Sequence, residues 1–235
     1  MKLKLSDRID VAEGTLGVWL VPEGTLDFTP GQFGDFTLPG LEDSDGKGDT
    51  RAFSFACAPG GDRILIATRQ RGSAFKRALA EMPSGSPVEL EGPMGGFTLH
   101  RDAKRPAVFL VGGIGITPVR SIVEHAVREG TGRRILVLHA NRSRASTPFL
   151  KDFQGWAAAA DGLAYVPTLD GEAPSGWDGE QGVIDAAMIA RHVDDLHAPV
   201  YYVVGPPAMV EAMKALLDGI GIDELQVRSE DFAGY

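Results

Sequence analysis

The first hundred residues consist of short apolar runs separated by turn residues. Clusters of glycine and proline, such as Pro59-Gly60-Gly61, lie between these runs, and runs of this length bounded by such clusters are typical of β-strands. One helical pattern interrupts them, from Ser73, a favourable N-cap residue, to Glu81 before Pro83. The spacing predicts an antiparallel Greek-key β-barrel as a first domain over residues 1–102. Its strands are expected at 16–21, 33–38, 51–56, 64–69 and 88–91.

Beyond residue 102 the pattern changes to continuous apolar strands that alternate with amphipathic helices. Strands that are apolar along their whole length are buried on both faces, as in a parallel sheet with helices on either side. We therefore expect a second domain over residues 103–235, with an α/β parallel-sheet nucleotide-binding fold. Its strands are expected at 107–111, 135–139, 163–168, 200–204 and 225–227, and its helices at 118–129, 148–160, 185–192 and 207–217.

Between two expected barrel strands lies an acidic segment that contains glycine, residues 42–49. It has almost no apolar side chain to bury, so it gains little from packing against the barrel. We interpret it as a mobile hairpin loop, and we do not expect it to take part in function.

Composition places the chain among ordinary globular proteins. Hydrophobic residues make up 43% and charged residues 23% of the 235 residues, a length sufficient for two domains of modest size. No apolar run approaches the roughly 18 residues that a membrane span needs, and the first residues show no secretory signal. We therefore expect a soluble, cytoplasmic protein with no membrane partner.

Charge and cysteine content exclude several classes of function. A formal net charge of −9 argues against general nucleic-acid binding, which depends on lysine and arginine. Cys57 is the only cysteine, so the chain forms no internal disulfide and holds no cysteine-ligated iron–sulfur cluster. We expect Cys57 to pack in the barrel as a small apolar residue. The five histidines show no metal-ligand spacing, and no metal site is expected.

A glycine-rich segment, Gly112-Gly113-Ile114-Gly115, follows an expected strand and leads into a helix. Glycines let the backbone approach an anion closely, and the first N–H groups of a helix point at it. Thr117 suits the N-cap and Pro118 the first helical position. Because Pro118 stands where the usual dinucleotide fingerprint has its third glycine, the loop differs from an ordinary Rossmann loop. A plain strand-to-helix turn is the alternative interpretation.

The next expected strand ends in Asn141-Arg142-Ser143-Arg144, where the dinucleotide fold commonly has an acidic residue for the ribose of NAD. Arginine at this place can hold the additional phosphate of NADPH through charge-assisted hydrogen bonds. We therefore expect Asn141, Arg142 and Arg144 to bind nucleotide, with NADPH preferred over NADH. In the alternative interpretation the arginines only cap the sheet edge.

Four motifs, in order along the chain, carry a specific resemblance. They are Arg51-Ala52-Phe53-Ser54, similar to an Arg-x-Tyr-Ser flavin motif and preceded by Pro30-Gly31-Gln32-Phe33; residues 92–97, similar to Gly-Pro-x-Gly-x-Phe; the loop 112–118; and residues 205–209, similar to Cys-Gly-Pro-x-x-Met. Over nearly its whole length the chain resembles the ferredoxin–NADP(+) reductase superfamily, in the short two-domain form without a fused iron–sulfur domain. The resemblance implies an FAD-binding barrel followed by an NAD(P)-binding domain.

The resemblance implies roles in the first domain. Arg51 would pair with the flavin phosphates, Phe53 would lie against the flavin or its ribityl chain, and Ser54 would hydrogen-bond near flavin N5. Phe53 replaces the usual tyrosine, which keeps the stacking surface and removes the hydroxyl. The residues expected to bind FAD in this domain are Arg51, Ala52, Phe53, Ser54, Arg69 and, at the helix N-terminus, Gly72, Ser73 and Ala74.

The resemblance also implies roles in the second domain. Val204 takes the place where many relatives have a cysteine, so no thiol would contact the nicotinamide. An aromatic residue near the C-terminus, Phe232 or Tyr235, would cover the flavin ring, and Glu230 would lie at the flavin edge. The expected catalytic residues are Ser54, Glu230 and Tyr235. The residues expected to hold the nicotinamide nucleotide, besides those after the second strand, are Gly113, Ile114, Thr117, Gly205, Pro206 and Met209.

Together these expectations describe an FAD-dependent NAD(P)H oxidoreductase. NADPH would pass a hydride to flavin N5 at the domain cleft, and FAD would pass electrons singly to a separate redox protein such as ferredoxin or flavodoxin. Two alternatives stay open. One is a reductase of small acceptors such as free flavin, ferric chelate or quinone, and the other is a non-catalytic electron-transfer or NADP-sensing subunit of a larger assembly.

Overall fold

The computed structural model describes residues 1–42 and 44–232. The chain divides into two compact units, which are taken one at a time below. Among the described residues, the first contains 1–42, 44–98 and 117–125, and the second contains 99–116 and 126–232. Within the described chain, none of the helices combines the length and apolar character needed to cross a membrane.

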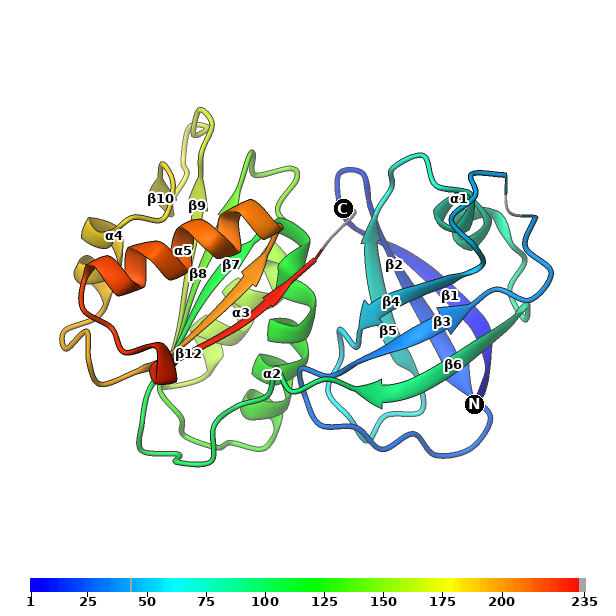
Figure 1. Ribbon diagram of the computed structural model, residues 1–235, viewed down its shortest axis with the longest axis horizontal. Coiled ribbons are helices and arrows are strands. Elements are labelled where there is room, and N and C mark those ends of the chain that lie inside the picture. Colours follow the sequence, from blue (N-terminus) through cyan, green and yellow to red (C-terminus); the bar gives the residue numbers. More distant parts are fainter. Residues whose placement is uncertain (43, 233–235) are drawn as a thin grey trace. The chain divides into compact units, whose positions relative to one another are not determined.

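The first unit is built on a six-stranded antiparallel sheet that curls into a barrel (Figure 1). Its strands are β1 (Lys2–Ala12), β2 (Thr15–Pro22), β3 (Phe33–Thr37), β4 (Thr50–Ser54), β5 (Ile64–Arg69) and β6 (Pro87–Met94). They follow the order β4-β3-β6-β1-β2-β5. The amide of Ala56, just after β4, donates to the carbonyl of Leu65 in β5, so the two outer strands also meet. The predicted barrel is confirmed.

Strand β1 is absent from the sequence prediction. Leu3 and Leu5 are almost completely buried, whereas Lys2 and Lys4, which alternate with them, are exposed. One face of the strand therefore packs on the core and the other faces solvent, as is usual in antiparallel sheets. The charged residues that alternate with leucine interrupt the apolar run, which is why the pattern did not identify a strand.

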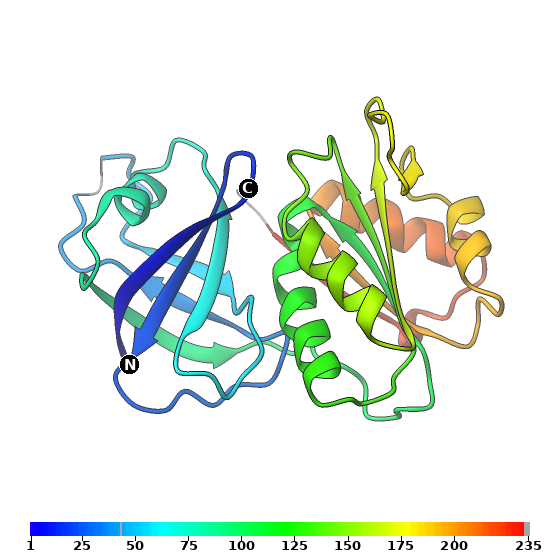
Figure 2. The same ribbon diagram turned by 180° about the vertical axis from the view of Figure 1, so that it is seen from behind.

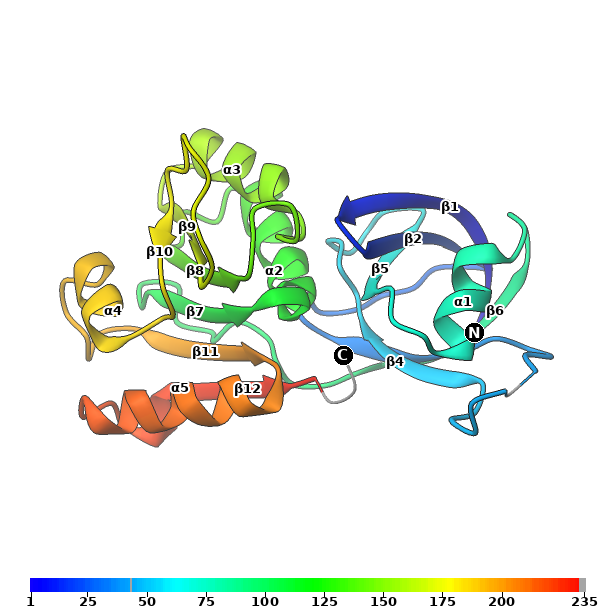
Figure 3. The same ribbon diagram turned by 90° about the horizontal axis from the view of Figure 1, so that it is seen from above.

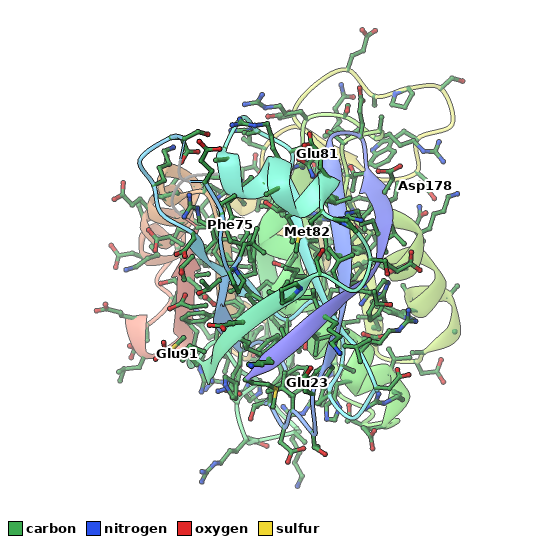
Figure 4. All side chains as sticks on the ribbon, turned by 90° about the vertical axis from the view of Figure 1, so that its right-hand side faces the viewer. Glu23, Phe75, Glu81, Met82, Glu91 and Asp178 are labelled. Atoms are coloured by element: carbon green, nitrogen blue, oxygen red, sulfur yellow. The ribbon has the colours of Figure 1, made fainter. Side chains whose placement is uncertain are left out.

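The barrel's helix, α1 (Ala74–Glu81), begins and ends with specific polar contacts. Ser73 is its N-cap and accepts a hydrogen bond from the Lys76 amide at 3.3 Å, as predicted. At the other end the Arg8 guanidinium donates to the Leu79 carbonyl at 2.9 Å and to the carbonyl of Met82, which Figure 4 labels. Phe75, also labelled in Figure 4, is fully buried and anchors α1 on the barrel core.

The second unit contains a six-stranded parallel sheet in the order β10-β9-β8-β7-β11-β12. The strands are β7 (Ala107–Gly112), β8 (Ile135–Asn141), β9 (Leu163–Leu169), β10 (Glu180–Gln181), β11 (Val200–Gly205) and β12 (Val227–Asp231), and the helices are α3 (Leu150–Ala159), α4 (Ala186–His192) and α5 (Pro207–Gly219). Helix α2 (Ile116–Arg128) follows β7 in the chain, and its residues 117–125 belong to the first unit. Figure 3 shows α3 on one side of this sheet and α5 on the other, and Figure 2 shows α3 in front of the strands. The predicted α/β parallel-sheet fold is confirmed.

The two faces of the parallel sheet have separate cores. On one face, alternate residues of the central strands pack against α4 and α5; this core includes Val108, Leu110, Leu136, Leu138, Tyr201 and Val203 from the strands and Met188, Ile189, Val210, Met213 and Leu217 from the helices. On the opposite face the ring of Tyr165 stacks on Phe153 of α3, with centroids 4.9 Å apart. Burial on both faces explains why these strands are apolar throughout.

Two boundaries differ from the prediction. The last strand was expected at 225–227, but Glu224–Gln226 form a 3₁₀ turn and β12 begins at Val227. Leu225, which suggested a strand, is 92% exposed. Helix α2 begins at Ile116, directly after the 3₁₀ turn Gly113–Gly115, so Thr117 lies inside the helix instead of at its N-cap.

Candidate functional site

In the first unit, the motif Arg51-Ala52-Phe53-Ser54 lies on β4. Phe53 is 3% exposed, and its ring lies 5.9 Å from that of Phe36 and 5.8 Å from that of Phe75. Its side chain therefore belongs mainly to the barrel core. Ser54 is buried and Ala52 is exposed. Of the four motif side chains, Arg51 has the polar group suited to an anion.

Arg51 is only partly satisfied by the protein. Its Nη1 donates to the carbonyls of Lys47 at 2.7 Å, Gly48 at 3.1 Å and Thr50 at 2.6 Å. Its Nη2 is buried and has no hydrogen-bond partner among the described residues. A buried guanidinium nitrogen without an acceptor is costly, and an anionic oxygen would satisfy it. This observation fits a phosphate-binding role for Arg51.

Further cations lie near Arg51. Lys76 of α1 is 5% exposed. Burial, followed by the positive charges of Arg71, Arg51 and Lys47, lowers the pKa of its ammonium group. A concentration of positive charge at the start of α1, in a chain with a net charge of −9, marks a local site for an anion. Nothing in the sequence pattern distinguished Lys76, because its burial is a tertiary feature.

The acidic segment 42–49, which we expected to be a mobile loop without a role, contacts this same place. The Asp45 carboxylate accepts a hydrogen bond from the Ala74 amide at 2.7 Å, and the Ser44 hydroxyl accepts one from Arg77 at 3.4 Å. The Ala74 amide is one of the first N–H groups of α1, which attract anions. The loop therefore supplies an anionic partner to the α1 N-terminus, and its expected mobility and lack of a functional role stay predictions.

The other predicted flavin-binding residues of this unit have varied surroundings. Gly72 is exposed, and a Cβ added to it would meet no atom within 4 Å. Arg69 donates to the Thr15 hydroxyl at 2.8 Å, a contact that links β5 to β2.

Cys57 is buried as expected. Its sulfur accepts a hydrogen bond from the Leu65 amide at 3.2 Å, and burial raises the pKa of its thiol to about 11. Cys57 is therefore an unreactive core residue.

In the second unit, the two glycine-bearing motifs meet at the carboxyl ends of β7 and β11. A Cβ added to Gly112 would lie 2.3 Å from the Met209 sulfur and 2.9 Å from Pro206. A Cβ on Gly115 would lie 2.8 Å from the Val204 carbonyl oxygen. Glycine at both positions lets the two backbones approach each other. In open parallel sheets, ligands bind at this end of the strands.

The segment after β8 carries the residues predicted to select the nucleotide. Asn141 is buried, and its side-chain oxygen has no hydrogen-bond partner among the described residues. Arg142 and Arg144 are exposed. The Ser143 hydroxyl lies 3.0 Å from that of Ser146, so the turn that presents the arginines is held by side chains. The unpartnered Asn141 oxygen fits a ligand group that donates a hydrogen bond, and the exposed arginines fit a ligand that carries negative charge.

Strand β12 places Glu230 beside β11, where its backbone pairs with Val204. One carboxylate oxygen of Glu230 is buried without a hydrogen-bond partner among the described residues. Burial, followed by the charge of Asp231, raises the pKa of this carboxyl group to about 7. The Phe232 amide donates to the Gly205 carbonyl at 3.0 Å. Glu230 and Phe232 therefore lie at the same sheet edge as Gly205, and Tyr235 lies outside the described residues.

Part of the chain matches a known family model. Residues 109–215 match the oxidoreductase NAD-binding domain. This range begins in β7 and ends in α5, so it includes the glycine loop, the segment after β8 and the motif after β11. Among the described residues, no three histidine, cysteine or acidic side chains gather as a metal-binding group.

Curated proteins and a solved structure extend the similarity beyond this domain. The chain is 29% identical to the reductase component of propane 2-monooxygenase from Mycolicibacterium goodii, over 90% of this chain and 61% of that protein. It is 28% identical to ferredoxin–NADP reductase B from Sorangium cellulosum, over 87% of this chain and 85% of that one. The FAD/NAD-binding domain of Vibrio cholerae nitric oxide dioxygenase superposes with a TM-score of 0.85 at 20% identity, over 98% of each chain.

The chain thus spans about three fifths of the monooxygenase reductase and most of the ferredoxin–NADP reductase. These matches cover both the antiparallel barrel and the parallel-sheet unit, in the order in which they occur here. The chain is therefore similar over most of its length to proteins named as reductases, one of them a ferredoxin–NADP reductase, and its residues 109–215 match the oxidoreductase NAD-binding domain.

Proposed function

We propose that this chain binds FAD on its first unit and NADPH on its second, and that it delivers electrons from NADPH to a separate one-electron redox protein. The observation that carries the proposal is the pair of incomplete polar sites, one in each unit: the buried, unpartnered Arg51 nitrogen and the buried, unpartnered Asn141 oxygen. Each site is suited to one of the two nucleotides. FAD would accept two electrons as a hydride and release them one at a time to the acceptor.

For FAD, the residues at the α1 N-terminus would hold the diphosphate. The Arg51 nitrogen supplies a charge-assisted donor, the Lys76 ammonium supplies positive charge, and the amides at the start of α1 supply neutral donors. The Ala74 amide already donates to Asp45. A diphosphate that takes this amide has to displace the carboxylate, so loop 42–49 has to move when FAD binds.

For the nicotinamide nucleotide, the carboxyl edge of β7, β8 and β11 would supply the site. Gly113 and Ile114 begin the 3₁₀ turn that leads into α2, where backbone N–H groups favour a phosphate. Arg142 and Arg144 would select NADPH, because their exposed guanidinium groups can pair with a 2′-phosphate. The relatives named above include a ferredoxin–NADP reductase, which agrees with this choice.

Glu230 would hold a proton at the sheet edge beside Gly205. A carboxyl group with a pKa of about 7 is partly protonated at neutral pH, so it both donates and accepts a proton readily. Ser54, buried at the end of β4, would provide a hydroxyl close to the flavin. The roles proposed for Glu230 and Ser54 follow from the resemblance to the ferredoxin–NADP(+) reductase superfamily, and mutagenesis can test both.

A protein acceptor is proposed because of the names of two relatives. One is the reductase component of a monooxygenase, and the other is a ferredoxin–NADP reductase. The chain has a single, buried cysteine and cannot ligate an iron–sulfur cluster itself. A cysteine-ligated cluster that takes the electrons therefore belongs to another polypeptide or to a part outside this sequence.

The proposal is tested with protein reconstituted with FAD and mixed anaerobically with NADPH or NADH in a stopped-flow spectrometer. We expect rapid loss of the flavin absorbance with NADPH, slower loss with NADH, and reoxidation by ferredoxin or flavodoxin but not by free flavin. A preparation that takes up no FAD would refute the proposal. Reoxidation by free flavin, ferric chelate or quinone alone would refute the protein acceptor and leave the flavoenzyme.

A further inference from the structure

His139 is completely buried near the carboxyl end of β8, and both of its ring nitrogens have partners. Nδ1 lies 2.9 Å from the Tyr165 hydroxyl, and Nε2 lies 2.9 Å from the Gly113 carbonyl oxygen. A carbonyl oxygen only accepts, so Nε2 carries the proton and donates it. Nδ1 then accepts from Tyr165, whose pKa is raised by burial and whose phenol therefore keeps its proton. The ring is fixed as one tautomer in one orientation.

The partner of His139 is a carbonyl of the glycine loop, in the Gly113–Ile114 peptide. Gly113 has φ of 51°, in the left-handed region that glycine adopts without strain. Because glycine adopts both signs of φ, Gly113 restricts the orientation of the following peptide less than another residue would. The Gly113 carbonyl oxygen has two lone pairs, and it accepts from the Ile116 amide as well as from His139. The two bonds together hold this peptide in one orientation.

The direction of this carbonyl decides the direction of the next amide. In a planar trans peptide the C=O and the following N–H point to opposite sides. Because the Gly113 carbonyl points at His139, the Ile114 N–H points away from it. That amide is among the first N–H groups ahead of α2, the groups that an anion binds. If the peptide rotated, it would present an oxygen to an anion instead of an N–H.

We infer that His139 is a positioning residue for nucleotide binding, which fixes the Gly113–Ile114 peptide in the orientation that a nucleotide diphosphate requires. The inference rests on the proposed function, since it concerns the loop to which NADPH is assigned. His139 touches no reacting group in this account. Its effect passes through one hydrogen bond to one carbonyl, and it therefore acts on affinity and not on the rate at saturation.

The same unit provides a matched control. His100 is also buried, its Nδ1 lies 3.0 Å from the Tyr202 hydroxyl, and its Nε2 lies 2.9 Å from a backbone carbonyl. That carbonyl belongs to Arg105, which lies before β7 and outside the glycine loop. Replacing His100 removes the same kinds of contact without touching the loop peptide.

The experiment compares His139→Leu, His139→Gln and His100→Leu by calorimetric titration of the FAD-loaded protein with NADP+ and with adenosine 2′-monophosphate, which lacks the diphosphate. We expect His139→Leu to weaken NADP+ binding about three- to tenfold, the value of one hydrogen bond. Binding of adenosine 2′-monophosphate stays unchanged. His139→Gln keeps a side-chain N–H and restores much of the affinity, and His100→Leu leaves both ligands unaffected.

A fourth variant keeps the test independent of how well leucine is tolerated. Tyr165→Phe leaves His139 in place but removes the hydroxyl that donates to its Nδ1 and helps to fix the orientation of the ring, and we expect a weakening of about twofold. The inference is overturned if the His139 variants and Tyr165→Phe bind NADP+ as the wild type does, if His100→Leu is equally weakened, or if adenosine 2′-monophosphate loses as much affinity as NADP+. Wild-type protein that binds FAD but no nicotinamide nucleotide would refute the proposed function itself, which is a different result.

Discussion

The carboxylate of Asp45 accepts a hydrogen bond from the amide of Ala74 at 2.7 Å, and so places a negative charge of the protein at the first turn of α1. The same loop offers the Lys47 and Gly48 carbonyls to Arg51. Loop 42–49 therefore engages both groups that are proposed to hold the flavin diphosphate. In the proposed function, a phosphate of FAD and the Asp45 carboxylate would compete for the Ala74 amide.

Replacing Asp45 should therefore tighten FAD binding. We expect Asp45→Ala to lower the dissociation constant for FAD about three- to tenfold, because the ligand no longer displaces a capping carboxylate. Quenching of flavin fluorescence measures this constant. Asp49→Ala is the matched control: it removes the same charge from the same loop, but its carboxylate accepts from the Thr50 hydroxyl and not from α1. Weaker FAD binding in Asp45→Ala would mean that the loop helps to hold the cofactor.

Ser54→Ala should slow reduction of the flavin without releasing it. If the Ser54 hydroxyl stabilises charge that develops during hydride transfer, its loss lowers the single-turnover rate on the order of 10- to 100-fold. Stopped-flow absorbance follows this rate, and the flavin spectrum reports FAD content. Ser73→Ala is a useful contrast, because Ser73 caps α1 and its removal should weaken FAD while leaving the rate of the loaded enzyme intact. An unchanged rate in Ser54→Ala removes that hydroxyl from the mechanism.

The arginines after β8 should distinguish the two nicotinamide nucleotides. The double variant Arg142→Ala and Arg144→Ala should raise KM for NADPH on the order of tenfold or more, because it loses charge-assisted bonds to the 2′-phosphate, and should change KM for NADH little. Steady-state kinetics with both nucleotides give the comparison. The double variant Arg133→Ala and Arg134→Ala removes the same charge at the opposite end of β8, so it should not change KM for NADPH relative to KM for NADH. Equal loss for NADPH and NADH would contradict the assignment.

Glu230 should make stability depend on pH. Its pKa is raised to about 7, above the ordinary value of 4.5, so between these values the folded state binds up to one more proton than the unfolded state. This contribution is fully present below pH 4.5 and is lost as pH rises through 7. Glu230→Gln should remove that fall in stability. Urea unfolding at pH 5, 6 and 7 measures it, and an identical pH dependence in the variant would show that Glu230 ionises normally.

The close approach of the two glycine motifs should be sensitive to one methyl group. A Cβ at Gly115 would lie 2.8 Å from the Val204 carbonyl oxygen and 2.9 Å from the Gly205 Cα, both backbone atoms that cannot turn aside. We expect Gly115→Ala to destabilise the protein by about 1–3 kcal/mol. Gly155→Ala, inside α3 with no atom within 4 Å of the new Cβ, should be neutral or stabilising by up to about 1 kcal/mol. Thermal unfolding that ranks the two variants in the reverse order would contradict this account.

Much of the fold follows from patterns that are local in the sequence. Apolar strands such as Ala107–Gly112 and Val200–Gly205 were predicted almost to the residue, because burial on both faces leaves no polar interruption. Ser73 and Pro83 likewise mark the limits of α1. Where a strand has one exposed face, as in Lys2–Ala12, charged residues hide it, and Leu225 suggested a strand although its side chain projects into solvent.

What the sequence determined by itself is the order of the two units and the types of residue available to each site. The tertiary structure decided which of those groups are buried without partners and which already have them. Asp45 reaches Ala74 across 29 positions, and His139 reaches Gly113 across 26. Such contacts depend on how loops and strands fold back on one another and on the desolvation that follows. The spacing of neighbouring residues in the sequence predicts neither the contacts nor the desolvation.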